Sequence, residues 1–188
     1  MEESTQYKSS DPASQENMAE YHNLIDSIER SMDPASNTVL IVDDERAIRK
    51  FVSRTIRKSD EQVVVIEASN GQEALEKLAE LRETHHRDPL IIVTDLNMPV
   101  MDGWEFIENL KKDYETRGLT QGIPVVVLSS TSGEKGHAFF KKSVHSGKSK
   151  YNPLVAVAKE DCLQPGKYDA LGEKGLHVWL RHFLRYNA

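Results

Sequence analysis

Residues 39–44 read Val-Leu-Ile-Val-Asp-Asp, a short apolar run that ends in two adjacent carboxylates. An uninterrupted apolar run of this length is typical of a strand that is buried on both faces of a parallel sheet. The segment that follows, residues 47–56, carries its apolar side chains at helical spacing. This stretch therefore predicts a buried strand, a polar turn and an amphipathic helix that packs on the sheet.

The same unit recurs along the rest of the chain. Segments with helical spacing occupy residues 72–81, 104–112, 135–144 and 174–186, and further apolar runs occupy residues 63–66, 90–93, 125–128 and 154–157. Five predicted strands thus alternate with five predicted helices. Such alternation is typical of the α/β class, in which a doubly wound parallel sheet carries helices on both faces.

Side chains suited to chemistry follow four of the five apolar runs. Asp43 and Asp44 follow the first run, Asp95 comes shortly after the third, and Ser129 and Lys159 come after the fourth and fifth. In doubly wound sheets, ligands bind beyond the carboxyl ends of the strands. We therefore expect these five side chains to share one hollow at that edge of the sheet.

The residue types in this hollow favour chemistry on a phosphoryl group. Three carboxylates placed close together repel, and a cation among them stabilises their charged forms. Carboxylate oxygens suit Mg²⁺, which also binds phosphate oxygens. An aspartate can act as a nucleophile toward phosphorus, while the ion and a lysine offset the charge of the transferred group.

Two local alternatives accompany this interpretation. Asp43 and Asp44 could instead be the N-cap and a first-turn acid of the following helix. Ser130, rather than Ser129, could supply the hydroxyl after the fourth run.

The block at residues 95–103 reads Asp-Leu-Asn-Met-Pro-Val-Met-Asp-Gly. Together with residues 40–44, 67–75 and 123–130, it resembles the receiver domain of two-component response regulators, the CheY-like family. The resemblance covers about residues 38–187 and implies a flavodoxin-like five-stranded sheet of order 2-1-3-4-5. Within the block, Asp102 is expected to serve a turn and the start of the next helix.

The resemblance implies a role for each residue of the hollow. Asp95 would accept the phosphoryl group, and it would also contact Mg²⁺. Asp44 would bind the ion directly, Asp43 mainly through water, and Asn97 through its backbone carbonyl. The side chains that contact the phosphoryl group would be Ser129 and Lys159.

The resemblance also implies the partners. The donor would be a sensor histidine kinase or a phosphotransfer protein, and the output would be contact with a protein that the sequence does not identify. The chain would assist its own phosphorylation and dephosphorylation without being an enzyme for another substrate. Alternatives are a receiver-fold binding module that phosphorylation does not control, and a receiver segment of a hybrid sensor kinase. A phosphatase with an aspartate nucleophile is disfavoured, because Asn97 stands where its general acid is needed.

Two positions depart from the family pattern. Glu160 follows Lys159 where the family usually has proline, and Ala156 stands where a rotating aromatic switch is common. The chain is also longer than usual between Ser129 and Lys159. We therefore expect switching to differ from the usual coupling of hydroxyl and aromatic movements.

Charge and composition divide the chain in two. Residues 1–37 hold eight acidic and two basic residues, whereas residues 38–188 hold 22 of each. We expect an acidic tail over residues 1–37, partly disordered, with an amphipathic helix near residues 17–32 that packs on its own domain or docks on a partner. Residues 38–188 would form the receiver domain, without a fused output domain after it.

The balanced charge of residues 38–188 disfavours direct nucleic-acid binding. The chain has no apolar run of about 18 residues that would span a membrane, and its first residues do not resemble a secretory signal. The single cysteine excludes an internal disulfide. We expect a cytoplasmic protein.

Overall fold

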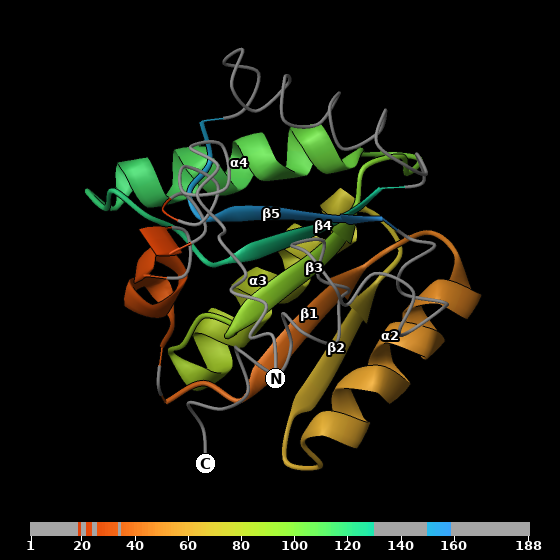
Figure 1. Cartoon of the computed structure of the whole chain (residues 1–188). Helices are drawn as coiled ribbons and strands as arrows, with labels where there is room; N and C mark the ends of the chain where they lie inside the picture. The colour runs from red at the N-terminus through yellow and green to blue at the C-terminus, as the bar shows by residue number, and fades with distance from the viewer. Residues whose placement is uncertain (1–18, 20–21, 24–25, 34, 130–149, 159–188) are drawn as a thin grey trace, which may run out of the picture.

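The computed structural model describes residues 19, 22–23, 26–33, 35–129 and 150–158. Its centre is a five-stranded parallel sheet of order β2-β1-β3-β4-β5 (Figure 1). The strands are β1 (Thr38–Val42), β2 (Val64–Ala68), β3 (Ile91–Asp95), β4 (Val125–Ser129) and β5 (Leu154–Ala158). The predicted class and strand order are confirmed.

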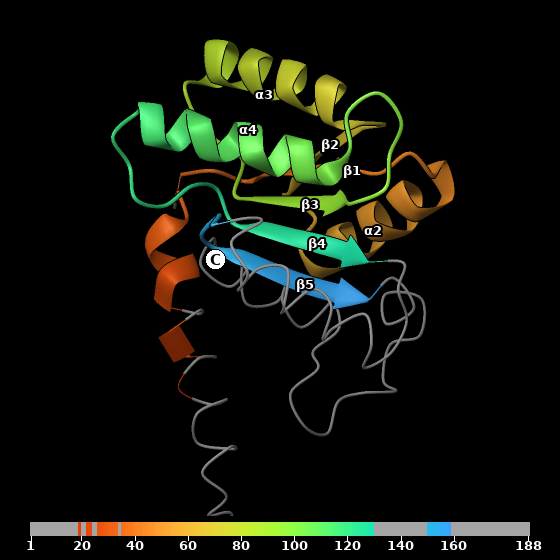
Figure 2. The ribbon, with the colours of Figure 1, turned by 90° about the horizontal axis from the view of Figure 1, so that it is seen from above.

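Helices lie on both faces of this sheet. Helix α2 (Arg46–Ser59) covers one face, and α3 (Gly71–His85) and α4 (Gly103–Thr116) cover the other (Figure 2). Each begins within a few residues of its predicted start and runs further than predicted. The helices predicted at residues 135–144 and 174–186 lie outside the described residues.

Two apolar clusters, one on each face, follow from the unbroken apolar strands. Along β1, Val39 and Ile41 belong to the cluster under α2, whereas Leu40 and Val42 belong to the cluster under α3 and α4. All four are at most 2% exposed. Side chains alternate between the faces of a strand, so a strand covered on both sides must be apolar at every position.

The strands β2 and β3 extend beyond their predicted ends. The predicted ends at residues 66 and 93 mark where the apolar runs stop, but pairing continues to Ala68 in β2 and Asp95 in β3. Backbone hydrogen bonds do not depend on side-chain polarity. The extension brings Asp95 into the sheet itself.

Residues 26–31 are helical and contact the sheet domain. Ile28 is 1% exposed and belongs to the apolar cluster under α2. The Ser27 hydroxyl donates to Asn152 Oδ1 over 3.0 Å, and the Ser31 hydroxyl donates to Gln121 Oε1 over 2.9 Å. The division at residues 37 and 38 stays a prediction, and these contacts lead us to expect that residues 26–33 stabilise the folded domain.

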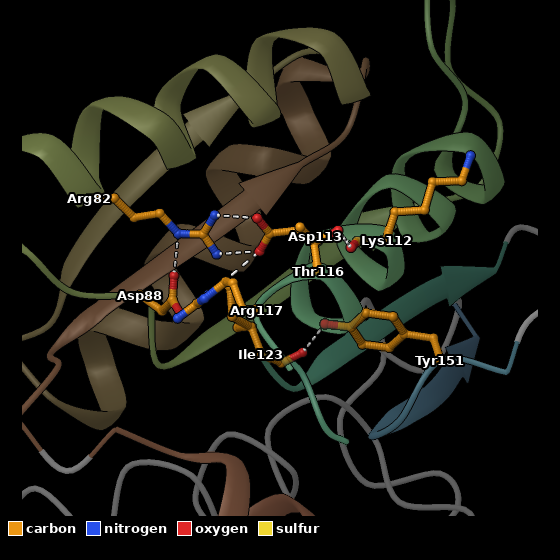
Figure 3. Close-up of polar contacts among 8 residues, drawn as sticks. All are labelled: Arg82, Asp88, Lys112, Asp113, Thr116, Arg117, Ile123 and Tyr151. Carbon is orange, nitrogen blue, oxygen red and sulfur yellow. Dashed lines mark hydrogen bonds and ion pairs between the residues drawn. The ribbon is translucent and has the colours of Figure 1, made fainter. Parts of the chain in front are cut away.

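An ion-pair network joins α3 to α4 near the start of β3 (Figure 3). Arg82 donates to Asp88 through Nε over 2.5 Å and to both carboxylate oxygens of Asp113 over 3.1 and 2.8 Å. Arg117 adds a 3.1 Å contact to Asp88. Bidentate pairing of this kind adds geometric specificity as well as interaction energy. The network therefore braces the amino-terminal end of the sheet, opposite the predicted site.

The start of α3 is held by a reciprocal cap. Asn70 accepts from the backbone N–H of Glu73 over 2.9 Å, and the Glu73 carboxylate accepts from the N–H and hydroxyl of Ser69 over 2.8 and 2.6 Å. These bonds from Ser69, helped by Lys77, lower the pKa of Glu73 from 4.5 to about 2. The charged carboxylate is thus the form that caps the helix.

We predict that Glu73→Gln lowers the free energy of unfolding at pH 7 by about 1 kcal/mol or less, since the carboxylate is partly exposed. A lowered folded-state pKa contributes stability above pH 4.5 that is lost as the pH falls toward about 2. Urea denaturation should therefore show a difference from wild type that shrinks over this range. The exposed Glu80→Gln is the control; an equal effect there, or a difference independent of pH, would contradict the role of the cap.

We predict that Ile28→Ala lowers the free energy of unfolding by about 2–4 kcal/mol, because it leaves a cavity in a packed cluster. Urea denaturation of the full chain measures the loss. Arg30→Ala, at an exposed position of the same helix, should stay within about 0.5 kcal/mol of wild type. Equal stabilities of the two variants would show that residues 26–31 are dispensable for the fold.

Candidate functional site

The carboxyl edge of the sheet brings three aspartates together. β1 and β3 are parallel neighbours in which Val42 lies opposite Thr94, so Asp43 and Asp95 each stand one residue beyond this pair. Asp43, Asp44 and Asp95 offer carboxylate oxygens that all lie within 4.8 Å of one another. The structure thus brings together three of the five side chains predicted to share a hollow.

Burial and backbone hydrogen bonds orient two of these carboxylates. Asp43 is 0% and Asp95 3% exposed, whereas Asp44 is exposed. Asp43 Oδ1 accepts from the N–H of Glu45 over 2.8 Å, and Asp95 Oδ1 accepts from the N–H of Leu96 over 2.7 Å. The neighbouring backbone therefore fixes the two buried groups, and the third faces solvent.

The alternative that Asp43 and Asp44 only start the following helix is wrong. The N-cap of α2 is Glu45, which makes no side-chain capping bond, and the first turn of α2 has no acidic residue. By contrast, Asp102 is the N-cap of α4 and accepts from the N–H of Glu105 over 2.8 Å. The predicted helix-start role of Asp102 is confirmed.

The loop between β3 and α4 is closed against the strand end. Gly103 N–H donates to the carbonyl of Leu96 over 2.8 Å. A Cβ atom at Gly103 would lie 2.1 Å from the carbonyl oxygen of Asp95 and 2.7 Å from Cα of Leu96. Only glycine allows α4 to begin this close to the backbone of Asp95.

Sequence reasoning missed one residue at this edge, Arg49 of α2. Its Nη1 donates to the backbone carbonyls of Asp43 over 2.6 Å and Asp44 over 3.3 Å. Its Nε donates to Glu67 Oε2 over 3.2 Å. The only signal in the sequence is a basic residue among the apolar positions of a helix, which does not by itself indicate a function.

The donor set of the three aspartates fits a divalent cation such as Mg²⁺. All three ligands are carboxylate oxygens, the kind of ligand that Mg²⁺ prefers. Two of the carboxylates are buried, where close negative charges are costly unless a cation or hydrogen bonds offset them. The exposed Asp44 leaves a path to solvent by which an ion and its waters can enter.

The remaining predicted residues are placed only in part. Asn97 is exposed in the loop two residues after Asp95. Ser129 ends β4, and Leu128 beside it pairs with Asp95, so the Ser129 backbone reaches the same edge. The side chain of Ser129 lies outside the described part of the structure, as do Ser130 and Lys159. Their predicted roles stay predictions.

The chain is similar to one protein family and to several known proteins. The family model of the response regulator receiver domain matches residues 39–146. A protein-glutamate methylesterase/protein-glutamine glutaminase of Syntrophomonas wolfei is 37% identical over 109 residues, which are 58% of this chain and 27% of that protein. The transcriptional regulatory protein YdfI of Bacillus subtilis is 34% identical over 94 residues, 50% of this chain and 38% of that protein.

Among solved structures, the chain is similar to one from a Saccharomyces cerevisiae complex. That crystal contains the histidine phosphotransfer protein Ypd1 and the receiver domain of its downstream response regulator Ssk1. The identity is 23%, the TM-score is 0.49, and the match covers 66% of this chain and 79% of that one. The chain spans only about a quarter to two fifths of the two curated relatives. None of the helices within the described residues has the length and hydropathy of a membrane span.

We predict that Gly103→Ala lowers the free energy of unfolding by about 1–3 kcal/mol, because the added methyl group meets fixed backbone atoms. Glycine to alanine in an ordinary helix raises stability by up to about 1 kcal/mol, so the sign of the change identifies the clash. Chemical denaturation measures it. Lys112→Ala, exposed on the same helix, is the control, and a stabilised Gly103→Ala would contradict the close approach.

Proposed function

The chain belongs to the response regulator receiver domain family over residues 39–146, and on that premise we propose that it accepts a phosphoryl group on Asp95 in a Mg²⁺-dependent reaction. The observation that carries the proposal is the cluster of Asp43, Asp44 and Asp95 at the carboxyl edge of the sheet. The donor we propose is a phosphohistidine on a sensor histidine kinase or a phosphotransfer protein. The exchange would take place in the cytoplasm.

The transfer requires Asp95 to act as a nucleophile. A carboxylate oxygen of Asp95 forms a bond to phosphorus, the phosphorus–nitrogen bond of the donor breaks, and its electron pair stays on the imidazole nitrogen. The Leu96 N–H holds Oδ1 of the same carboxylate, so the group is oriented before the donor arrives. Pre-positioning and electrostatic stabilisation are together the main contributions a protein makes to phosphoryl transfer.

The two neighbouring acids prepare the site for the cation. In this proposal Asp44 binds the ion directly and Asp43 mainly through water, with the Asn97 carbonyl as a further ligand. A bound Mg²⁺ would offset the negative charge of the phosphoryl group as it approaches three carboxylates. Asp43 is buried and bonded to Glu45 N–H, which supports a fixed position for it.

Two further residues complete the proposed site. The Ser129 hydroxyl would donate to an oxygen of the bound phosphoryl group, and the Lys159 ammonium would pair with it. The backbone position of Ser129 beside the end of β3 supports the first assignment. The family match over residues 39–146 includes Ser129, whereas the assignment of Lys159 rests on the resemblance of the sequence after the fifth apolar run. Signalling then proceeds by contact with a downstream protein. Since Ala156 replaces the usual aromatic residue, the change in surface would not depend on aromatic rotation at this position.

We predict that a small-molecule phosphodonor such as acetyl phosphate, with Mg²⁺, adds one phosphoryl group to the wild-type chain and none to Asp95→Asn. Intact-mass spectrometry reads the product directly. Asp102→Asn is the matched control: it makes the same substitution at an exposed helix cap that asparagine can also fill, and it should be labelled like wild type. Chelation of Mg²⁺ should abolish the labelling of the wild-type chain and of Asp102→Asn.

Equal labelling of Asp95→Asn and wild type would refute Asp95 as the acceptor. An unlabelled wild-type chain that is folded would instead favour a binding module that phosphorylation does not control. Phosphotransfer from purified sensor histidine kinases then tests the proposed donor, and Asp95→Asn serves there as the unreactive reference.

A further inference from the structure

Arg49 connects three parts of the molecule at the acidic edge. It lies on α2, and its guanidinium reaches back to the carbonyls of Asp43 over 2.6 Å and Asp44 over 3.3 Å. The same group donates from Nε to Glu67 at the end of β2 over 3.2 Å. Its side chain is only 16% exposed. The helix, the acidic turn and the neighbouring strand are therefore joined through one planar group.

Glu67, the partner of Arg49 in β2, is itself held in place. Glu67 pairs with Ile41 in the register between β2 and β1. Its backbone carbonyl accepts from Lys77 Nζ of α3 over 2.6 Å. The Glu67 carboxylate thus projects from an edge strand that is held by its pairing with β1 and by the contact from Lys77, and it gives Arg49 a fixed partner.

The acidic turn needs such support because its charges oppose one another. Asp43 and Asp44 are adjacent in the chain, and both direct carboxylate oxygens toward Asp95. Repulsion at this separation favours opening of the turn. Asp44 is exposed, so packing does little to fix it. Hydrogen bonds to the two backbone carbonyls hold the turn without occupying the carboxylates.

We propose that Arg49 is a positioning residue that holds Asp43 and Asp44 in the geometry needed to bind a divalent cation. The inference rests on the proposed function, since it assumes that the three aspartates hold such an ion. Arg49 does not contact the ion or the phosphoryl group. It acts through the backbone that carries two of the ligands.

The charge of Arg49 provides a way to test this role. If only the charge of Arg49 mattered, its guanidinium would repel Mg²⁺ from the neighbouring aspartates. Removing that charge should then tighten Mg²⁺ binding. Pairing with Glu67 offsets much of that charge. Loss of the hydrogen bonds should weaken binding instead. The two explanations therefore predict opposite signs for the same substitution.

The test measures the Kd for Mg²⁺ by calorimetric titration of the full chain. Arg49→Met should raise the Kd about tenfold, as is typical when a partner that orients a metal ligand is removed. Arg49→Lys should also raise it, because one ammonium cannot reproduce the planar fork that reaches two carbonyls and a carboxylate. Arg54→Met removes an exposed arginine of the same helix and should leave the Kd unchanged.

Melting temperatures measured without Mg²⁺ show whether a substitution at Arg49 changes the stability of the fold, independently of its effect on Mg²⁺ binding. A lower melting temperature with an unchanged or tighter Kd in Arg49→Met would overturn the proposal. If Arg49→Met does not fold, Arg49→Lys and Glu67→Gln decide by the same criterion. A wild-type chain that fails to bind Mg²⁺ would count against the proposed function as a whole, whereas normal wild-type binding with unaffected Arg49 variants would remove only the role of Arg49.

Discussion

Two buried carboxylates face a common point because β1 and β3 are parallel neighbours, and this constraint organises the candidate site. The pairing of Val42 with Thr94 places Asp43 and Asp95 at the same height on the carboxyl edge. In water such groups would separate, but the sheet holds them within 4.8 Å together with Asp44. The free energy of the apolar clusters on both faces keeps the strands in place against this repulsion.

Contacts from other elements hold the backbone at this edge of the sheet against the repulsion between the carboxylates. Gly103 lets α4 begin against the carbonyl of Asp95, and Arg49 bonds the carbonyls behind Asp43 and Asp44. Both contacts act on the backbone, so the carboxylate oxygens remain directed at the common point. The ion pairs of Arg82 lie at the opposite end of the sheet. The Arg82 ion pairs therefore lie at one edge, whereas the acidic cluster and the Arg49–Glu67 pair lie at the other.

The loop after β3 also stores backbone strain. Val100 has a φ of 70°, and the N–H of Met101 bonds the carbonyl of Pro99 across it over 2.9 Å. A β-branched residue rarely adopts this conformation. Val100 is 82% exposed, so little packing compensates for the strain. Strained loops of this kind are common beside functional sites, and this one follows the proposed acceptor by five residues.

The sequence alone determined the alternation of the five strands with α2, α3 and α4 and located the acidic edge, because apolar runs and the polar residues that follow them are local patterns. It missed the full length of β3, since hydrogen bonding continues through the polar Thr94 and Asp95 after hydrophobicity stops. Only the tertiary structure decided that Arg49 bonds the acidic turn and that Ile28 enters the core. Those contacts arise where separate elements meet in space: periodicity marks the apolar face of a helix, but it does not identify the residues that this face or a single polar side chain meets.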